Sequence, residues 1–403
     1  GAGTITLTGS DAVSMDADSL IQADGAVAIT AGANDVTLDV VTSTGSTVTI
    51  DATVGGSILA TDATNSVNGT LVTLNASTAA GESVGLDGTR INTTAGTLTG
   101  TAGTGGFFVT EANDVLVSTI VVTGVGDVGL TSTGGNITIA DNGISSGGGA
   151  VSVTADAGSI LEQTANTTAN ITTTGAVTLA AATSIGGSLA NEELDVASTT
   201  DLTVDANDTL TVRGDGQTLT TLTITVDAGG TAPVYELGNF TGLTENITSD
   251  GTDLTITNLD STNGTSISLT NDTGNVSVAS FDTSGTGTLT LNATTGGISL
   301  ADGAIVNDTG TVSLTAALTI NEATSNTTAN VTTNGNLSLS SGTGIGATGA
   351  DAVDVSVGGV LDVATTGSGA GIFINGTTAL TVDAISTLAT DTATVAFTTT
   401  SGA

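Results

Sequence analysis

Short runs of alternating apolar and polar residues recur along the chain. At 4–8, 136–139 and 151–154, Ile, Val or Leu occupies every second position, and Thr, Ser or Asn stands between them. Because successive side chains of a strand point to opposite faces, this alternation predicts strands with one buried and one polar face. Clusters of Gly, Asn and Asp at 141–143 and 147–149 supply turns. The pattern predicts an all-β protein with almost no helix.

The spacing of these strands indicates how they are arranged. In the best-preserved region the apolar pairs begin at positions 115, 128, 137, 151 and 160, in alternating long and short steps. Two strands therefore recur every ~22 to 23 residues, an interval that suits one coil of a parallel β-solenoid, also called a β-helix. In such a fold, inward Val, Ile and Leu side chains stack along the axis, and Thr, Ser and Asn line the outside.

The apolar spacing is itself duplicated. Residues at about 114–200 match those at about 275–360, and the pentapeptide Asn-Thr-Thr-Ala-Asn of 166–170 returns at 326–330. A weaker similarity of the segment at about 34–62 to the repeat that begins at about 114 indicates a smaller unit of roughly 80 residues. Repeated units usually stack and bury their apolar faces against their neighbours, so no single catalytic pocket is expected.

A string of immunoglobulin-like β-sandwiches is the main alternative fold, because about 80 residues is a plausible length for such a module. Sandwich cores usually contain several aromatic residues and their linkers contain prolines. This chain has six Phe, one Tyr, no Trp and one proline, Pro233. The composition favours a single continuous β-solenoid with internal duplication over residues 1–403.

Charge restricts the partners. Arg90 and Arg213 are the only basic residues, against 39 acidic ones, and the net charge is −37. Nucleic acids and anionic membranes are bound through clustered Lys or Arg, so neither is an expected partner. No run of apolar residues is long enough for a transmembrane helix, which excludes insertion of that kind. With no cysteine there is no disulfide and no thiolate metal site.

The missing residue types also restrict the chemistry. Without His, Cys or Lys the chain cannot form the usual nucleophile and base pairs, a Schiff base or a Walker lysine. Only carboxylates remain, and glycosidases do use two of them. Glu192 with Glu193, and Asp205 with Asp208, are neighbouring acids that make an acidic carbohydrate-active β-helix enzyme an alternative. The simpler interpretation is solvated turn residues, and we predict no enzyme.

Arg213, Gly214 and Asp215 form an Arg-Gly-Asp tripeptide. Presented in a turn, this tripeptide can bind integrins through its guanidinium and carboxylate groups, which makes it a candidate for cell attachment. The alternative interpretation is that 214–216 simply forms a turn.

Calcium is the candidate inorganic partner, because Asp and Asn crowd the turns and hard oxygen ligands suit Ca²⁺. The candidate ligands are Asp250, Asp253, Asp272 and Asp308. Neither the EF-hand spacing nor the nonapeptide of calcium β-rolls is present. No other cofactor is predicted.

Asn-x-Ser/Thr sequons are dense and are candidates for glycosylation. They include Asn68, Asn75, Asn136, Asn239, Asn246, Asn292 and Asn375. A strand face rich in Thr and Asn also produces this spacing by alternation alone.

The segments 135–144 and 149–155 resemble the repeats of filamentous-haemagglutinin-type proteins and related large β-strand-repeat adhesins. The resemblance covers nearly the whole chain at the level of pattern. It implies a secreted, right-handed parallel β-helix of a bacterial surface that works as an adhesin, stalk or fibre.

The two ends of the sequence read as continuous with each other. Residues 397–403 joined to 1–7 resemble the internal segment 281–291, and neither end shows a polar or helical cap. We therefore expect either head-to-tail assembly with other copies or one segment of a giant repeat protein.

The predicted function is a non-enzymatic extracellular structural protein, the shaft of a surface fibre, filament or adhesin. Its expected partners are other copies of itself and a host or neighbouring cell surface. A cation- or glycan-binding surface module is the alternative from a different class.

Overall fold

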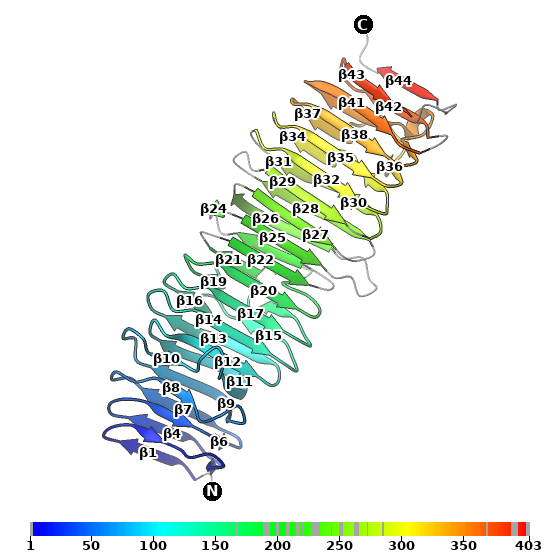
Figure 1. Ribbon diagram of the computed structural model, residues 1–403. Coiled ribbons are helices and arrows are strands. Elements are labelled where there is room, and N and C mark those ends of the chain that lie inside the picture. Colours follow the sequence, from blue (N-terminus) through cyan, green and yellow to red (C-terminus); the bar gives the residue numbers. More distant parts are fainter. Residues whose placement is uncertain are drawn as a thin grey trace. The chain divides into compact units, whose positions relative to one another are not determined.

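The structure is a computed structural model (Figure 1). It describes residues 3–165, 168–187, 194–198, 201–206, 210–214, 218–219, 221–226, 234–242, 244–249, 253–261, 266–271, 273–283, 286–367, 370–387 and 394–399. The chain divides into two compact units, unit 1 (Gly1–Ala206) and unit 2 (Asn207–Ala403).

Unit 1 consists of stacked parallel strands that form three ladders (Figure 1). The first ladder contains β1 (Ile5–Gly9), β4 (Val27–Ala31), β7 (Thr47–Ala52), β9 (Ser66–Ala76), β11 (Ile91–Ala102), β13 (Val115–Val122), β15 (Ile137–Ile139) and β18 (Ile160–Glu162). The second contains β2 (Val13–Ser14), β5 (Val36–Leu38), β8 (Ile58–Ala60), β10 (Ser83–Val84), β12 (Gly106–Glu111), β14 (Val128–Ser132), β17 (Val151–Ala155), β20 (Val177–Ala181) and β22 (Asp201–Ala206). The third side is formed by β3 (Leu20–Ala23) and β6 (Val40–Ser43), which lead to β9, and by β16 (Ile144–Ser146), β19 (Ile171–Thr172) and β21 (Leu194–Ala197), which follow β13.

Unit 2 is built in the same way. Its first ladder contains β25 (Thr221–Val226), β27 (Thr244–Ser249), β29 (Ser266–Asn271), β32 (Leu289–Ala293), β35 (Val312–Ala316), β38 (Leu337–Ser341), β41 (Val360–Thr365) and β43 (Thr381–Ser386). The second contains β23 (Leu210–Gly214), β26 (Val234–Gly242), β28 (Leu254–Ser261), β30 (Val276–Val278), β33 (Ile298–Leu300), β36 (Thr319–Glu322), β39 (Gly344–Ile345), β42 (Ile372–Gly376) and β44 (Val395–Thr399). The third contains β31 (Phe281–Thr283), β34 (Ile305–Asn307), β37 (Val331–Thr333) and β40 (Val353–Val357), and the short β24 (Thr218–Leu219) pairs with β26.

The predicted parallel β-solenoid is confirmed. Adjacent coils pair in parallel, as Ile5 does with Val27 and Val27 with Val48. In the described part of the chain, the only antiparallel contact is an isolated bridge between Leu86 and Thr89. Immunoglobulin-like sandwiches are made of antiparallel sheets, so that alternative is wrong.

The coil differs from the prediction in two details. Most coils carry three strands, whereas the sequence predicts two, because strands such as β16 and β34 are only three residues long and show too little alternation to be recognised. Coil length also varies around the predicted 22 to 23 residues. Val27 pairs with Val48 and Val151 pairs with Val177, separations of 21 and 26 residues. The extra residues lie in the turns.

The core is a set of aliphatic stacks. Ile29 pairs with Ile50 and Ile50 with Leu74, and all three side chains are fully buried. Burying an aliphatic side chain of this size contributes roughly 1.5–3 kcal/mol relative to exposing it. Neighbouring residues such as Thr30 and Thr49 face outward. The alternation of the sequence thus corresponds directly to inside and outside.

The two matching regions of the sequence have matching registers. Ile137 pairs with Ile160 in unit 1, and the equivalent Ile298 pairs with Ile320 in unit 2. Each of these two pairings lies inside one unit. That residues 1–403 form one continuous solenoid stays a prediction.

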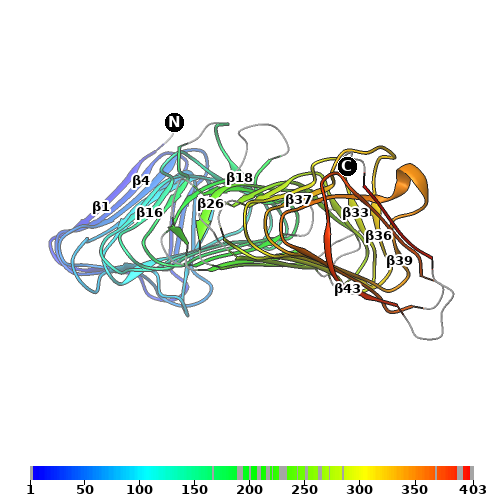
Figure 2. The ribbon, with the colours of Figure 1, turned by 90° about the horizontal axis from the view of Figure 1, so that it is seen from above.

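Helical structure is nearly absent from the residues that the structure describes. One 3-10 turn, η1 (Gly349–Asp351), precedes β40, and in Figure 2 it is the orange turn near β36 and β39. No helix in the described ranges is long and apolar enough to cross a membrane.

A buried asparagine joins three successive coils of unit 2. The Asn330 side chain is fully buried, and its Nδ2 donates to the carbonyls of Leu300 (3.4 Å) and Ala301 (3.2 Å) in the preceding coil. The backbone N–H of Asp354 in the following coil donates to Asn330 Oδ1 at 2.9 Å. The amide therefore supplies the acceptor for the Asp354 N–H and adds a second donor to two carbonyls that already accept the backbone N–H groups of Ala323 and Ala304.

The equivalent residue in unit 1 has the same role. Asn170 is fully buried, its Nδ2 donates to Ile139 O and Ala140 O, and its Oδ1 accepts from the N–H of Asp195. Asn170 and Asn330 are the last residues of the repeated pentapeptide. The recurrence of its final asparagine therefore has a structural cause.

We predict that Asn330→Ala lowers the free energy of unfolding by about 1–3 kcal/mol, because it leaves the buried backbone N–H of Asp354 without its acceptor. Chemical denaturation followed by circular dichroism measures this change. Asn321→Ala is the matched control, since Asn321 is exposed on the outside of the same unit, and it should change the value by less than about 0.5 kcal/mol. Equal effects of the two substitutions would contradict the role given to Asn330.

Candidate functional site

The carboxylate pairs noted in the sequence are described only in part. Asp205 lies in β22 and is half-buried. Its candidate partner Asp208, and both Glu192 and Glu193, lie outside the described residues. The structure therefore adds no support for an acid/base pair at these positions.

The Arg-Gly-Asp tripeptide is only partly described. Arg213 and Gly214 end strand β23, where Arg213 is in register with Gly238 of β26. These two residues are therefore the end of a strand, and the turn expected at 214–216 stays a prediction. Asp215 lies outside the described residues. Cell attachment stays a prediction.

The calcium candidates do not form a site where they are described. Asp250 and Asp272 lie outside the described residues, and Asp253 and Asp308 are exposed. Asp253 Oδ1 accepts hydrogen bonds from the backbone N–H and from Nδ2 of Asn275, at 2.7 and 3.2 Å, so this carboxylate links two coils. Within the described ranges, no group of three or more acidic side chains could hold a metal ion.

Most of the described sequon asparagines lie on the outside of the coils. Asn68, Asn75, Asn136 and Asn292 are half-buried, and Asn239 and Asn246 lie in β26 and β27. Several of the side chains link coils. Asn68 Nδ2 donates to Thr42 Oγ1 at 3.0 Å, and Asn75 Nδ2 donates to Asp51 Oδ1 at 2.8 Å.

Asn375 has to be removed from the glycosylation candidates. Its side chain is only 5% exposed, and its Nδ2 donates to the buried carboxylate of Asp354. A glycan is attached through this nitrogen and needs open solvent beside it, so the folded coil leaves no room for one. The sequon at this position arises from strand alternation.

Four acidic residues that the sequence analysis did not select come together in unit 2. We call Asp302, Glu322, Asp351 and Asp354 the acidic cluster. Asp302 lies in the turn between β33 and β34, Glu322 ends β36, Asp351 ends η1, and Asp354 lies in β40. They come from three successive coils, with Asp351 and Asp354 in the same one, and the solenoid places them together at one side of the unit.

Two carboxyl oxygens of this cluster are shielded from solvent and have no hydrogen-bond partner. They are Glu322 Oε2 and Asp354 Oδ2. The other oxygens are bonded, since Glu322 Oε1 accepts from the backbone N–H of Asn326 at 3.2 Å and Asp354 Oδ1 accepts from Asn375. Asp354 is only 1% exposed. Buried carboxylate oxygens without donors are costly, which sets this pair apart from an ordinary solvated acid.

The electrostatics follow from this arrangement. Burial, followed by repulsion from Asp354, Asp302 and Asp351, raises the pKa of Glu322 to about 7, although the Asn326 N–H opposes the shift. Burial also raises the pKa of Asp354, with a further contribution from Asp302. Glu322 therefore holds its proton close to neutral pH.

A surface loop and a cleft border the cluster. Asn326 Nδ2 donates to both oxygens of Asp302, at 2.8 and 2.9 Å, and Ser325 donates to Asp351. A cleft of about 300 Å³ lies next to Glu322, and its lining includes Asn275, Ser299, Thr319 and Asn321. Small solutes that enter this cleft can therefore approach Glu322.

The internal duplication of the sequence could have revealed this cluster, because its acids recur in both copies. Asp302, Glu322, Asp351 and Asp354 align with Asp141, Glu162, Glu192 and Asp195 in the earlier copy. The residues on either side of the glutamate differ between the copies, with Leu161 and Gln163 in one and Asn321 and Ala323 in the other. A comparison restricted to apolar positions does not detect these acids.

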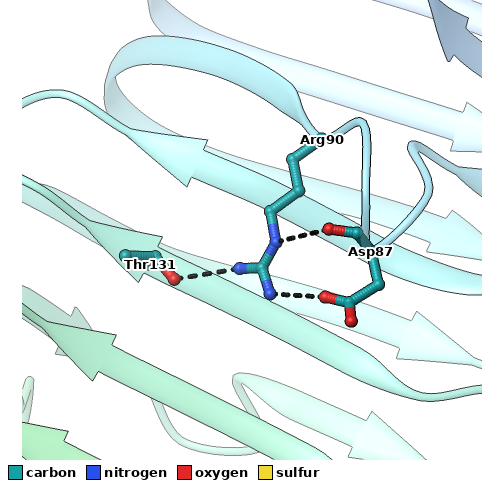
Figure 3. A network of polar contacts seen from close by, with 3 residues as sticks. All are labelled: Asp87, Arg90 and Thr131. Atoms are coloured by element: carbon teal, nitrogen blue, oxygen red, sulfur yellow. Dashed lines mark hydrogen bonds and ion pairs between the residues drawn. The ribbon is translucent and has the colours of Figure 1, made fainter. Parts of the chain in front are cut away.

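Arg90 anchors a surface hairpin of unit 1 (Figure 3). Its Nη2 contacts Asp87 Oδ1 at 2.7 Å, and its Nη1 donates to Thr131 Oγ1 at 2.9 Å. Gly129 makes this possible, because a Cβ at that position would lie 3.1 Å from Arg90 Nη2 and 2.8 Å from a ring carbon of Phe108. The arginine therefore ties the loop before it to a strand 41 residues later.

Comparisons with known proteins give no family for this chain: no family model, curated protein or solved structure matches it. Function therefore has to be argued from the fold and the sites themselves.

We predict that the stability of unit 2 falls as the pH rises from about 4.5 to about 7. The pKa of Glu322 is raised from 4.5 in the folded chain, so the folded state keeps a proton that the unfolded state has lost. The contribution of Glu322 to the stability of the fold is complete below about pH 4.5 and is lost as the pH rises through about 7. Glu322→Gln keeps the neutral form, so it should raise the thermal midpoint by a few degrees at pH 8 and change it little at pH 4.

The control for this pH series is Asp18→Asn, which removes one exposed acid at a left-handed position that Asn also tolerates. If the parent chain and Glu322→Gln lose stability in parallel across this range, Glu322 is not the group responsible.

We predict that trypsin cleaves the folded chain slowly after Arg90. The contacts to Asp87 and Thr131 hold the hairpin, and losing one hydrogen bond of about 1 kcal/mol should increase the open population roughly fivefold. Thr131→Val should therefore accelerate the appearance of fragments 1–90 and 91–403, followed by mass spectrometry. Thr138→Val in β15, which lies away from Arg90, serves as the control. Equal cleavage rates in the two variants would contradict the anchoring role.

Proposed function

We propose that this protein is a non-enzymatic extracellular structural protein, the shaft of a surface fibre, filament or adhesin. The observation that carries the proposal is the stacking of coil on coil within each unit, with aliphatic side chains inside and Thr, Ser, Asn and acidic side chains outside. In a parallel ladder each strand is hydrogen-bonded to the strands of the preceding and following coils, so opening one strand has to break several hydrogen bonds at once.

The coils at the two ends support a longer assembly. In β43 every residue is exposed, whereas its neighbour β41 buries every second one. Val382, Ile385 and Val395 are 38%, 48% and 40% exposed, and Leu7 in β1 is 39% exposed. Apolar side chains at these strand positions are covered in interior coils. Further coils, from another copy or from flanking sequence in a longer protein, would cover them here.

The exterior suits a solvated shaft outside cells. A net charge of −37 keeps such particles soluble and mutually repelling. The chain offers trypsin-like proteases only Arg90 and Arg213, and Arg90 is engaged in contacts. These properties favour a secreted location and contact with a host or neighbouring cell surface.

The enzymatic alternative receives little support from the acidic cluster. Glycosidase carboxyls have to reach the substrate, whereas Asp354 is almost completely buried. The cation-binding alternative is favoured by a specific observation, the two unpartnered carboxyl oxygens of this cluster.

We expect electron microscopy of the purified protein to show filaments whose axial repeat is close to the length of one chain. Ile385→Asp, which adds a charge to the exposed end strand, should shorten or abolish them. Val306→Asp is the matched control, because Val306 is 37% exposed on an interior coil of the same unit. Isolated particles at all concentrations of the parent chain would overturn self-assembly and leave flanking coils of a longer protein as the covering partner.

A further inference from the structure

A groove of about 460 Å³ crosses successive coils of unit 1, where the strands of the third side meet those of the first ladder. Strands β6, β9 and β11, which contribute to it, lie in the blue part of Figure 1. Every residue that lines the groove is Thr, Ser, Asn or Gly. We call it the neutral groove and define it by Thr42, Asn68, Thr70, Thr94, Gly96 and Asn113.

The polar groups of the neutral groove repeat from coil to coil. Thr42 is in register with Asn68, and Asn68 is in register with Thr94. All three side chains face outward, because the residues before them, such as Val41 and Val67, are buried in the core. Neighbouring coils of a parallel ladder lie about 4.8 Å apart. The groove therefore presents hydrogen-bonding groups at a regular interval along the solenoid axis.

The floor of the groove is bare main chain at two positions. A Cβ at Gly69 would lie 3.2 Å from the carbonyl oxygen of Ser46, and a Cβ at Gly96 would lie 3.0 Å from that of Thr70. Glycine inside a strand often stands where another backbone or a ligand approaches closely. Because no side chain rises from these positions, a flat ring can lie directly on the peptide groups.

A buried carboxylate fixes the shape of the groove. Glu111 is fully buried and accepts hydrogen bonds from Thr93 Oγ1 at 2.7 Å and from the backbone N–H groups of Ala95 and Ala112, each at 3.0 Å. Ala95 lies between Thr94 and Gly96, and Ala112 precedes Asn113. One carboxylate thus holds two segments that line the groove, so the groove is formed before any ligand arrives.

Two polar side chains of the groove remain available to a ligand. Asn68 Nδ2 already donates to Thr42 Oγ1 at 3.0 Å, and Thr70 Oγ1 donates to the carbonyl of Ser46 at 3.0 Å. Among the residues that the structure describes, the Thr94 hydroxyl has no hydrogen-bond partner, and neither does the side-chain amide of Asn113. Both residues are exposed.

The charge of the chain selects the class of ligand. None of the residues that line the groove is charged, although the chain carries a net charge of −37. A cation such as Ca²⁺ prefers carboxylates, which the lining lacks. An anionic ligand needs basic groups and is repelled by the rest of the chain. An apolar ligand would cover the polar lining without pairing it. An uncharged ligand rich in hydroxyl groups fits best, and an uncharged glycan is such a ligand.

We propose that the neutral groove binds an uncharged glycan chain of the extended, cellulose-like type, which lies along the solenoid axis. The sugar rings of such a chain recur at a distance close to the coil spacing, so successive rings meet the groups of successive coils. Thr94 and Asn113 hydrogen-bond the glycan hydroxyls, and the bare floor at Gly69 and Gly96 accepts the rings. The site gives a chemical class to the surface contact proposed above, but it lies within unit 1 and does not depend on filament formation.

The test is saturation-transfer NMR of the full chain titrated with cellohexaose. We expect saturable binding by the parent chain and roughly twentyfold weaker binding by Thr94→Val/Asn113→Ala, because two hydrogen bonds are lost at roughly fivefold each. The matched control is Thr178→Val/Asn321→Ala, which makes the same changes at exposed positions outside the groove and should bind as the parent does. Circular dichroism verifies that both variants are folded.

Maltohexaose provides a control for the shape of the ligand. It contains the same sugar as cellohexaose but coils instead of extending, so we expect it to bind much more weakly. Equal binding of the two oligosaccharides would overturn the proposed match to the coil spacing. Absence of saturation transfer to cellohexaose in the parent chain overturns the proposal altogether. Equal affinities of the groove variant and the control variant overturn it as well, because the glycan is then held elsewhere on the chain.

Discussion

The structure depends on the parallel main-chain ladder between successive coils. Neighbouring strands in such a ladder lie about 4.8 Å apart, so each inward side chain lies directly over its partner in the next coil. Ile29, Ile50 and Leu74 form one such stack. Aliphatic residues gain from this arrangement in every coil, whereas a charge placed inside would lie against its neighbours without water. The ladder therefore explains both the aliphatic core and the position of most acids on turns and outer faces.

Some buried polar residues pair with backbone groups of neighbouring coils. Asn170 and Asn330 do this by joining carbonyls of one coil to an N–H of the next. Glu111 does it with a carboxylate that accepts several N–H and O–H groups. In these three residues the buried polar atoms are paired, and burial then adds rigidity to the turn. Other polar side chains, including those of Asp39, Asn271, Glu322 and Asp354, each have a shielded oxygen without a hydrogen-bond partner.

The sequence by itself determined the faces of the longer strands and the parallel solenoid, because alternation and the approximate coil interval are local properties. It did not reveal the short third strand of most coils or the variation in coil length. It also located Asn170 and Asn330 through the recurrent pentapeptide, although not their role. Only the tertiary structure decided which polar groups meet. Asp302, Glu322 and Asp354 are 20 and 32 residues apart in sequence, and they come together because turns of unequal length still return each strand to register. Burial of Asn375 likewise depends on the coil packed against it, and no sequon reveals that.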